Sequence, residues 1–368
     1  MKTILDNPIN INKVDKSRML DDLAKTADYC RDALKLAMNL NLDLKFSPKN
    51  IVIVGMGGSA IGGEILHDWL RDNLPLSIEV CRDYLLPAYV NEDTLVFANS
   101  YSGNTEETLT ACLDAKKRKS TIIAVTSNGK LAEFCKRLQI PHVIIPSGLQ
   151  PRAAIPYLFF PFPILMKKLG ILTNIEDELE EAIRVFEKIS KENALDVASE
   201  SNKAKKLALE LIETIPVIYG FREYTSIAHR LKAQFNENSK LPSKSDVFPE
   251  LNHNETVGYE APESLIKKHT IILIRDPNEP KEIKNRIETS KKLVFVKANK
   301  ILEIIAEGKG KLARMFSVMC IGDHVSVYLA ILQNIDPSPV KIIDKVKHEL
   351  SKKSDMQQKF EEEIAKLE

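Results

Sequence analysis

The chain has 368 residues, of which 44% are hydrophobic and 28% are charged, and its formal net charge is +1. This length predicts about two domains, and the balanced charge gives no electrostatic reason to expect a nucleic-acid or membrane-surface partner. The five cysteines form no C-x-x-C pair, the N-terminus has no apolar leader, and no run approaches 18 apolar residues, so we expect a soluble cytoplasmic protein without a disulfide framework, metal cluster or membrane span.

The first segment, residues 1–47, has the pattern of an amphipathic helix. Its apolar residues recur at steps of three and four, namely Met19, Leu20, Leu23, Ala27, Leu34, Ala37 and Met38. Such a stripe buries one face of a helix against a core. We therefore expect this segment to pack at the entrance to the first domain and to carry no chemistry.

A buried strand at Ile51–Val54 is followed by a glycine turn, residues 55–63, which holds Gly55, Gly57, Gly58, Ser59, Gly62 and Gly63. A strand, a glycine turn and a helix at the start of an α/β domain mark the place where a ligand meets the sheet edge. Gly55-x-Gly57-x-x-Ala60 also satisfies the dinucleotide fingerprint loosely, which leaves an NAD(P) enzyme as an alternative. The acidic residue that this fingerprint requires about 20 residues on has only Asp83 as a candidate, somewhat too far along the chain.

A second strand, Leu95–Ala98, leads into a hydroxyl loop, residues 100–105, and then into an acidic helix start. The loop carries Ser100, Ser102 and Thr105, whose hydroxyls can donate to an anion at the positive end of the following helix. Gly103 allows a close approach of the backbone. The alternative is that Thr105 is an ordinary N-cap, which does not explain the crowded serines. A phosphate monoester fits this loop without a metal or a lysine.

Strands and helices alternate through the first half. Strands are predicted at Ser77–Cys81, Thr94–Ala98, Thr121–Val125 and His142–Ile145, and helices at Glu106–Lys119 and Lys130–Leu138. This alternation favours a doubly wound, mostly parallel sheet. A polar stretch, residues 125–128, ends one strand at the same carboxyl edge as the glycine turn and the hydroxyl loop, so all three should meet in one crevice.

A proline-rich stretch, residues 149–163, ends the first domain and contains Arg152. The arginine could bond a linker carbonyl, or its guanidinium could stabilise negative charge that develops on a substrate. Spacing alone leaves both interpretations open.

The second half begins with two charged helices over 176–214 and then repeats an α/β pattern. Strands are predicted at Pro216–Tyr219, Thr270–Ile274 and Lys292–Val296, and helices at Tyr224–Gln234, Glu282–Lys291 and Lys311–Gln333. This half has no glycine turn or hydroxyl loop, which indicates a similar fold that has lost the phosphate site. The tail, residues 345–368, reads as a charged helix.

Two polar segments of the second half hold candidate acid–base groups. Glu237 lies among amides in Phe235–Lys240, and His253 lies in the polar loop Glu250–Glu255. A solvated glutamate and a bystander histidine are the ordinary interpretations of such residues. Together, however, they supply the base and the acid that proton transfer between carbon atoms needs.

The motifs, in this order, resemble the bifunctional phosphoglucose/phosphomannose isomerase family. They are G-M-G-G-S at 55–59, S-Y-S-G-N-T at 100–105, P-R-A-A at 151–154, F-N-E-N-S-K at 235–240, E-L-N-H-N-E at 250–255 and D-P-S-P-V at 336–340. S-Y-S-G-N-T on its own is similar to the phosphate loop of SIS (sugar isomerase) domains. The resemblance runs from about residue 50 to 350.

This resemblance implies an α/β protein of two SIS-like doubly wound, mostly parallel-sheet domains with helical N-terminal and bridging segments. The first would span 48–150 and the second 214–352, with the helical segment 1–47 before them, a linker and bridging helices over 151–213, and a charged tail over 353–368. The implied protein is a cytoplasmic homodimer that uses no cofactor and no metal.

The resemblance also implies roles. Ser100, Ser102 and Thr105 would hold the phosphate of a phosphosugar, and Gly57, Gly58 and Ser59 would line the sugar. In the catalytic set, Glu237 would shuttle a proton between C2 and C1, Arg152 would stabilise the enediolate, His253 would assist ring opening from the partner subunit, and Lys347 would assist it from the other side. Lys345, two residues away, is the alternative to Lys347.

Three departures from the family pattern stand out. Ala60 replaces a glycine, Gln150 replaces a proline, and the tail beyond about residue 350 is longer than the family needs. None touches a catalytic group.

The resulting hypothesis is interconversion of glucose 6-phosphate and mannose 6-phosphate with fructose 6-phosphate. The alternatives are a non-catalytic SIS-type phosphosugar sensor and an NAD(P)-dependent oxidoreductase.

Overall fold

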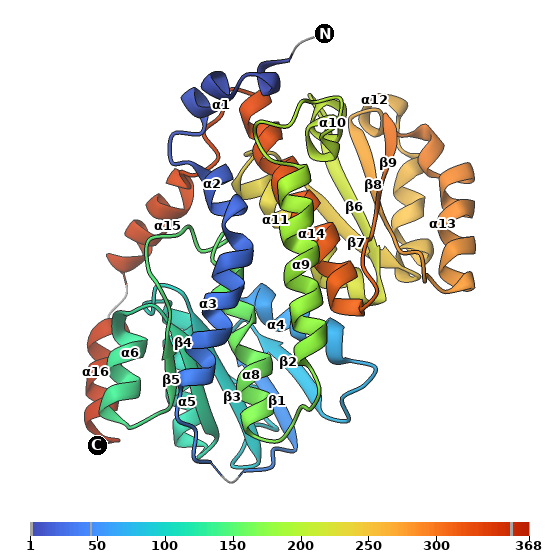
Figure 1. The fold of residues 1–368 in the computed structure, drawn as a ribbon. Helices are drawn as coiled ribbons and strands as arrows, with labels where there is room; N and C mark the ends of the chain where they lie inside the picture. Colours follow the sequence, from blue (N-terminus) through green and yellow to red (C-terminus); the bar gives the residue numbers. More distant parts are fainter. Residues whose placement is uncertain (1–2, 45, 354–355, 368) are drawn as a thin grey trace. The chain divides into compact units, whose positions relative to one another are not determined.

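The computed structural model describes residues 3–44, 46–353 and 356–367, and its contacts divide the chain into two compact units. Unit 1 comprises Met1–Ala27 and Glu176–Pro339, and unit 2 comprises Asp28–Ile175 and Val340–Glu368. Each unit contains one parallel sheet. Each terminal segment thus belongs to the unit whose sheet is formed by the opposite half of the chain (Figure 1).

The sheet of unit 2 has five strands in the order β2-β1-β3-β4-β5. They are β1 (Asn50–Val54), β2 (Ser77–Cys81), β3 (Thr94–Ser100), β4 (Thr121–Thr126) and β5 (His142–Ile144). The strand order reverses between β1 and β3, which pair in parallel with Val54 opposite Ala98. Ligands of open α/β sheets bind at such a switch point, and here the glycine turn follows β1 while the hydroxyl loop follows β3.

Helices cover both faces of this sheet, which explains why its central strands β1, β3 and β4 are almost continuously apolar. Alternate residues Val96 and Ala98 of β3 belong to a core cluster with residues of α5 (Glu106–Lys117) and α6 (Gly129–Arg137). The intervening Phe97 packs on the other face, with its ring centroid 5.0 Å from that of Phe162 in α8 (Pro161–Lys168). All seven residues of β3 are buried as a result.

The sheet of unit 1 has four strands in the order β7-β6-β8-β9, and all of its pairs are parallel. They are β6 (Ile215–Phe221), β7 (Lys244–Phe248), β8 (His269–Arg275) and β9 (Lys300–Ile305). Strand β6 takes the place in this order that β1 takes in unit 2, so β8 corresponds to β3.

A single long helix, α14 (Lys311–Leu332), forms the centre of unit 1. Of the described residues, this helix alone is long and apolar enough to cross a membrane by length and composition, but 94% of its apolar window is buried. Helices α9 (Glu176–Glu192), α10 (Lys203–Glu210) and α11 (Thr225–Glu237) pack against it. We therefore regard α14 as the core helix of this unit.

The remaining elements surround the two cores. The α-helices are α1 (Pro8–Val14), α2 (Met19–Ala24), α3 (Thr26–Asn39), α4 (Gly58–Leu70), α7 (Ile155–Phe159), α8 (Pro161–Lys168), α12 (Glu263–Ile266), α13 (Lys281–Leu293), α15 (Lys341–Ser351) and α16 (Met356–Ala365). The 3₁₀ turns are η1 (Ile4–Asp6), η2 (Arg222–Tyr224), η3 (Glu250–His253), η4 (Glu255–Glu260) and η5 (Phe295–Lys297).

The expected fold class of two parallel-sheet α/β domains is confirmed, and the strands of the first half lie within two residues of their predicted ends. In the second half the strand predicted at Lys292–Val296 is wrong, because that segment is the end of α13 followed by η5. The actual strand is β9, and the edge strand β7 was not predicted. Both are only partly buried: β7 reads KSDVF, and Glu303 interrupts the apolar residues of β9, which reads KILEII. Neither therefore shows the uninterrupted apolar run that identifies a buried strand.

The buried ion pair between α11 and α14 gives the first prediction. Arg230 Nη2 lies 2.7 Å from Asp323 Oδ2, and the two side chains are 3% and 1% exposed. Arg230→Ala leaves a buried carboxylate without its cation, so urea unfolding followed by circular dichroism should show unit 1 destabilised by about 3–5 kcal/mol. The exposed pair Lys191–Glu187 is the control, since Lys191→Ala should cost less than about 1 kcal/mol. Equal effects of the two substitutions would contradict this account.

Candidate active site

The glycine turn is locked to β3 by hydrogen bonds from both sides. The Asn99 side chain donates through Nδ2 to the carbonyls of Ser59, at 2.6 Å, and Leu158, at 3.1 Å. The Ser59 hydroxyl accepts a hydrogen bond from the backbone N–H of Tyr101 at 3.1 Å. The turn and the hydroxyl loop therefore form one rigid edge at the switch point of the sheet.

The hydroxyls of the loop bond to each other rather than cap the helix. Ser100 Oγ lies 3.0 Å from Thr105 Oγ1 and accepts a hydrogen bond from the Gly103 N–H at 3.1 Å. Thr105 occupies the N-cap position of α5, but among the described residues its side chain makes no capping hydrogen bond. Ser102 is exposed and accepts from the Asn104 N–H at 3.3 Å. An ordinary capping role therefore does not account for Thr105.

Gly103 lets the hydroxyl loop lie directly on the turn between β4 and α6. Its φ is +68°, and a Cβ atom would lie only 1.7 Å from the carbonyl oxygen of Asn128. The backbone N–H of Leu131 donates to Gly103 O at 2.9 Å, and that of Lys130 donates to Asn104 Oδ1 at 3.1 Å. The close approach that the structure shows at Gly103 is thus between two parts of the chain, whereas the approach of its backbone to an anion stays a prediction.

Arg152 lies beside the glycine turn. A Cβ on Gly58 would lie 2.7 Å from the Pro151 carbonyl oxygen and 3.3 Å from the backbone nitrogen of Arg152. The glycine turn and the turn that holds Arg152 therefore touch through their backbones. The Arg152 side chain is 3% exposed, and its Nη1 donates to Gln150 Oε1 at 3.4 Å. Gln150, one of the departures from the family pattern, is thus a direct neighbour of the guanidinium, so the expectation that no departure touches a group of the predicted catalytic set is wrong. Unit 2 brings the predicted phosphate and sugar residues together with this arginine.

Glu237 is the last residue of α11, in unit 1, and is half-buried. The residues after it are fixed to α14, since Asn238 Nδ2 donates to Ser326 Oγ at 2.9 Å and Ser239 Oγ donates to Ser326 O at 2.6 Å. Lys240 Nζ donates to the carbonyl of Glu237 itself. These contacts fix the end of the helix from which the Glu237 side chain extends.

His253 ends η3 and is exposed. A buried network anchors the segment that follows it, because the Tyr219 hydroxyl donates to Glu255 Oε1 at 2.8 Å and pairs with the Tyr259 hydroxyl at 2.8 Å. Lys244 forms an ion pair with the same glutamate. Burial, together with Tyr259 and Glu255, raises the pKa of Tyr219 well above its ordinary value, so its hydroxyl stays protonated and donates.

On its other side the His253 loop borders a groove of about 520 Å³ that α13 helps to line. Asn252 Nδ2 donates to Ser290 Oγ of α13 at 2.8 Å, and Arg286 Nη1 donates to Asn252 Oδ1 at 3.3 Å. The loop therefore presents its histidine outward from a well-braced base.

Lys347 lies on α15, in unit 2. All the residues of this helix are described, and none of them is buried. Lys345 on the same helix is equally exposed. The choice between these two lysines therefore stays a prediction.

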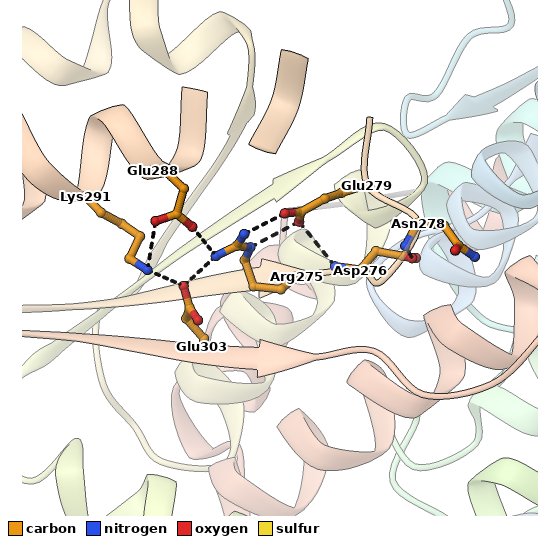
Figure 2. Close-up of polar contacts among 7 residues, drawn as sticks. All are labelled: Arg275, Asp276, Asn278, Glu279, Glu288, Lys291 and Glu303. Atoms are coloured by element: carbon orange, nitrogen blue, oxygen red, sulfur yellow. Dashed lines mark hydrogen bonds and ion pairs between the residues drawn. The ribbon is translucent and has the colours of Figure 1, made fainter. Parts of the chain in front are cut away.

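The sheet edge of unit 1 that corresponds to the hydroxyl loop is filled by the chain's own charges. Figure 2 shows Arg275, at the end of β8, between Glu279 on one side and Glu288 and Glu303 on the other. Its nitrogens lie 2.5, 2.8 and 2.6 Å from oxygens of these three carboxylates, and Lys291 Nζ lies 2.8 Å from Glu303. The hydrogen bonds from Arg275 to Glu279 hold the pKa of this arginine above its usual value. Because the charges of Arg275 and Lys291 are already paired with these three carboxylates, this edge does not favour the binding of a phosphate.

Two positioning residues were not predicted from the sequence. Asn99 is fully buried, and its Oδ1 has no hydrogen-bond partner among the described residues. Tyr101 accepts from the Leu149 N–H through its hydroxyl, at 2.9 Å, and from the Ser127 hydroxyl through its carbonyl, at 2.6 Å. Asn99 could have been noticed as the one amide within the apolar strand Leu95–Ser100, whereas nothing local singles out Tyr101.

The comparisons with known proteins agree with this architecture. A family model described as "SIS domain" matches residues 46–145, and one described as "Bacterial phospho-glucose isomerase C-terminal SIS domain" matches residues 200–350. A solved glucose-6-phosphate isomerase like protein from Thermus thermophilus shares the fold, with a TM-score of 0.62 at 18% identity, covering 91% of this chain and 97% of that one. Fold and site together define a protein built from two SIS domains.

Relatives with higher identity narrow this class. A bifunctional phosphoglucose/phosphomannose isomerase of Caldicellulosiruptor bescii is 41% identical over 92% of this chain and 100% of its own length. One of Aquifex aeolicus is 38% identical over 83% of this chain and 91% of its own. The chain belongs to the bifunctional phosphoglucose/phosphomannose isomerase family.

The packing of Gly103 gives a prediction with a matched control. Gly103→Ala must displace the Asn128 carbonyl and with it the hydroxyl loop, so the Michaelis constant for fructose 6-phosphate should rise by about tenfold or more, the equivalent of one lost charge-assisted hydrogen bond. Gly170 has a similar φ of +73°, but among the described residues, apart from Gly170 and its two chain neighbours, no atom lies within 4 Å of the place that its Cβ would take.

Gly170→Ala should therefore cost only the left-handed backbone penalty, about 1–2 kcal/mol, and leave the Michaelis constant unchanged. Steady-state kinetics and thermal melts of both variants make the comparison. The same kinetic constants in both variants would show that the close approach at Gly103 does not shape the site.

Proposed function

We propose that this protein is an aldose–ketose isomerase that interconverts glucose 6-phosphate and mannose 6-phosphate with fructose 6-phosphate. The observation that carries the proposal is the hydroxyl pair Ser100–Thr105 at the start of α5, beside the glycine turn and the buried Arg152, in a chain of this family. The small-molecule substrate is thus a sugar phosphate.

The phosphate is held by Ser100, Ser102 and Thr105 with the first N–H groups of α5. The helix dipole favours the dianion there, and hydroxyl donors add charge-assisted hydrogen bonds. Gly57, Gly58 and Ser59 line the sugar. The hydrogen bonds of Asn99 to the glycine turn support a fixed spacing between phosphate and sugar sites.

Glu237 is the base of the proton transfer. Its carboxylate takes the proton from C2 of the open-chain aldose, the C2–H electron pair forms the C1–C2 double bond, and the π pair of the C1 carbonyl moves onto O1 to give an enediolate. The proton of the O2 hydroxyl passes to O1, the C2 carbonyl forms, and the same carboxyl group returns its proton to C1. Arg152 stabilises the negative oxygen, since a buried guanidinium aimed at developing charge lowers the barrier without reorganising. The attachment of the residues after α11 to α14 supports a base carried on a fixed helix end.

His253 and Lys347 open the sugar ring, and we assign His253 to the site of a partner subunit in a homodimer. Its exposure on a braced loop supports a role outside its own subunit. The enzyme acts in the cytoplasm and requires no cofactor or metal for this chemistry. Family membership favours catalysis over the alternatives of a phosphosugar sensor and an NAD(P) oxidoreductase.

The role of Glu237 gives a direct prediction. Glu237→Gln keeps the size of the side chain but cannot accept a proton, so turnover should fall by about 10²–10⁴-fold while binding of fructose 6-phosphate persists. In deuterated water the wild-type enzyme should place deuterium on C2 of the aldose product, because the proton held by the carboxyl group exchanges with solvent. Kinetics and mass spectrometry provide the two measurements.

The exposed Glu263, also in unit 1, provides the control, since Glu263→Gln should leave turnover unchanged. Near-normal turnover of Glu237→Gln would refute the assigned base. Absence of deuterium in the wild-type product would refute the enediol path.

The assignment of His253 to the partner subunit can be tested by mixing two inactive variants. If the histidine acts across a two-fold interface, a dimer of one His253→Ala and one Glu237→Gln subunit contains one intact site. Random pairing after subunit exchange then restores about a quarter of wild-type turnover, since half of the dimers are mixed and each has one working site of two. Size-exclusion chromatography confirms the dimer. No recovery in a verified mixed dimer would place both residues in one subunit.

A further inference from the structure

The C-terminal helix α16 packs on the two helices whose first turns border the hydroxyl loop. Phe360 and Ile364 of α16 are 3% and 1% exposed and belong to the core cluster that contains Leu113 of α5 and Phe134 of α6. The ring centroids of Phe134 and Phe360 are 5.7 Å apart. Figure 1 shows α16 alongside α6. The tail is therefore part of the core of unit 2.

Ion pairs connect α16 to the same two helices. The Glu361 carboxylate lies 3.4 Å from Lys130 Nζ and 2.9 Å from Arg137 Nη1, both on α6, and Glu363 lies 2.5 Å from Lys117 Nζ on α5. The hydrogen bonds of Glu363 to lysines lower its pKa to about 2, so the pair of Glu363 with Lys117 persists at neutral pH. One short helix thus contacts both α5 and α6.

Lys130 connects this contact to the phosphate site. Its side chain meets Glu361, and its backbone N–H donates to Asn104 Oδ1 of the hydroxyl loop at 3.1 Å. Its neighbour Leu131 donates to Gly103 O at 2.9 Å. On the other side α5 begins one residue after Thr105. The relative placement of α5 and α6 therefore sets the shape of the hydroxyl loop, which contacts the first turns of both helices.

We propose that α16 acts as a clamp, made of Phe360, Glu361, Glu363 and Ile364, that fixes α5 against α6 and thereby sets the affinity of the hydroxyl loop for a phosphate group. The four are positioning residues. This inference rests on the proposed function. Preorganising a site saves the cost of ordering it when the ligand binds, and a coupling between two sites acts equally in both directions. A bound phosphate must then also hold α16 in place.

The first experiment measures inorganic phosphate as a competitive inhibitor of fructose 6-phosphate isomerisation in variants of the full chain. Phe360→Ala/Ile364→Ala should raise the inhibition constant and the Michaelis constant by about tenfold, within the usual range of coupling, while kcat changes by less than about twofold. Glu361→Gln should raise the inhibition constant and the Michaelis constant by roughly two- to threefold, because a part-exposed ion pair contributes little stability. Glu362→Gln removes the same charge from the exposed side of α16 and should change neither constant.

The second experiment uses the intact protein and so does not depend on how the variants fold. Saturating inorganic phosphate should slow hydrogen exchange of the α16 amides. Because coupling is reciprocal, the factor by which exchange slows should equal the factor by which loosening α16 weakens phosphate binding. Unchanged exchange in α16, or unchanged inhibition constants in folded Phe360→Ala/Ile364→Ala, would overturn the clamp. Failure of the wild-type protein to isomerise fructose 6-phosphate would instead refute the proposed function, and phosphate-dependent exchange would still decide the clamp.

Discussion

The candidate site depends above all on the contact between the hydroxyl loop and the turn that follows β4. Gly103, with φ +68°, brings the loop onto the Asn128 carbonyl, and Gly129, with φ +77°, faces Ser102 and Asn104 in return. Two left-handed glycines thus allow two backbones to meet where any side chain would separate them. Because of this contact the first turns of α5 and α6 lie together, the Ser100 and Thr105 hydroxyls point at each other, and the glycine turn can be tied to the same edge through Asn99.

The two units use one architecture for different purposes. In both sheets the strand order reverses beside the first strand of the unit, so both have a switch point where ligands of this fold bind. In unit 2 that edge carries hydroxyls and a helix start. In unit 1 that edge carries Arg275 (Figure 2), whose guanidinium forms ion pairs with carboxylates of the chain, among them Glu279 and Glu303. Unit 1 instead offers Glu237 and His253 from a helix end and a braced loop. In the proposed function, only the hydroxyl loop of unit 2 therefore binds a phosphate.

The sequence predicted the parts of this structure that are encoded locally. The central strands of the first sheet, β1, β3 and β4, are buried on both faces and therefore strongly apolar, and the serines and glycines of the site are unusual in composition. The half-exposed strands β7 and β9 lack that signal, which is why one was missed and the other was placed about eight residues too early. Contacts between distant residues could not be predicted, since nothing near Arg152 indicates that its turn touches Gly58, and nothing in the charged tail indicates that Phe360 joins the core beside Phe134.

The central claim is that this fold catalyses an isomerisation through its own side chains. The most direct test is to mix the purified protein with fructose 6-phosphate, in the presence of a chelator and without nicotinamide cofactor, and to follow both aldose products over time. The account predicts that glucose 6-phosphate and mannose 6-phosphate both appear at a rate proportional to enzyme concentration. Formation of neither product, with fructose 6-phosphate bound but unchanged, would contradict it and would indicate a phosphosugar sensor.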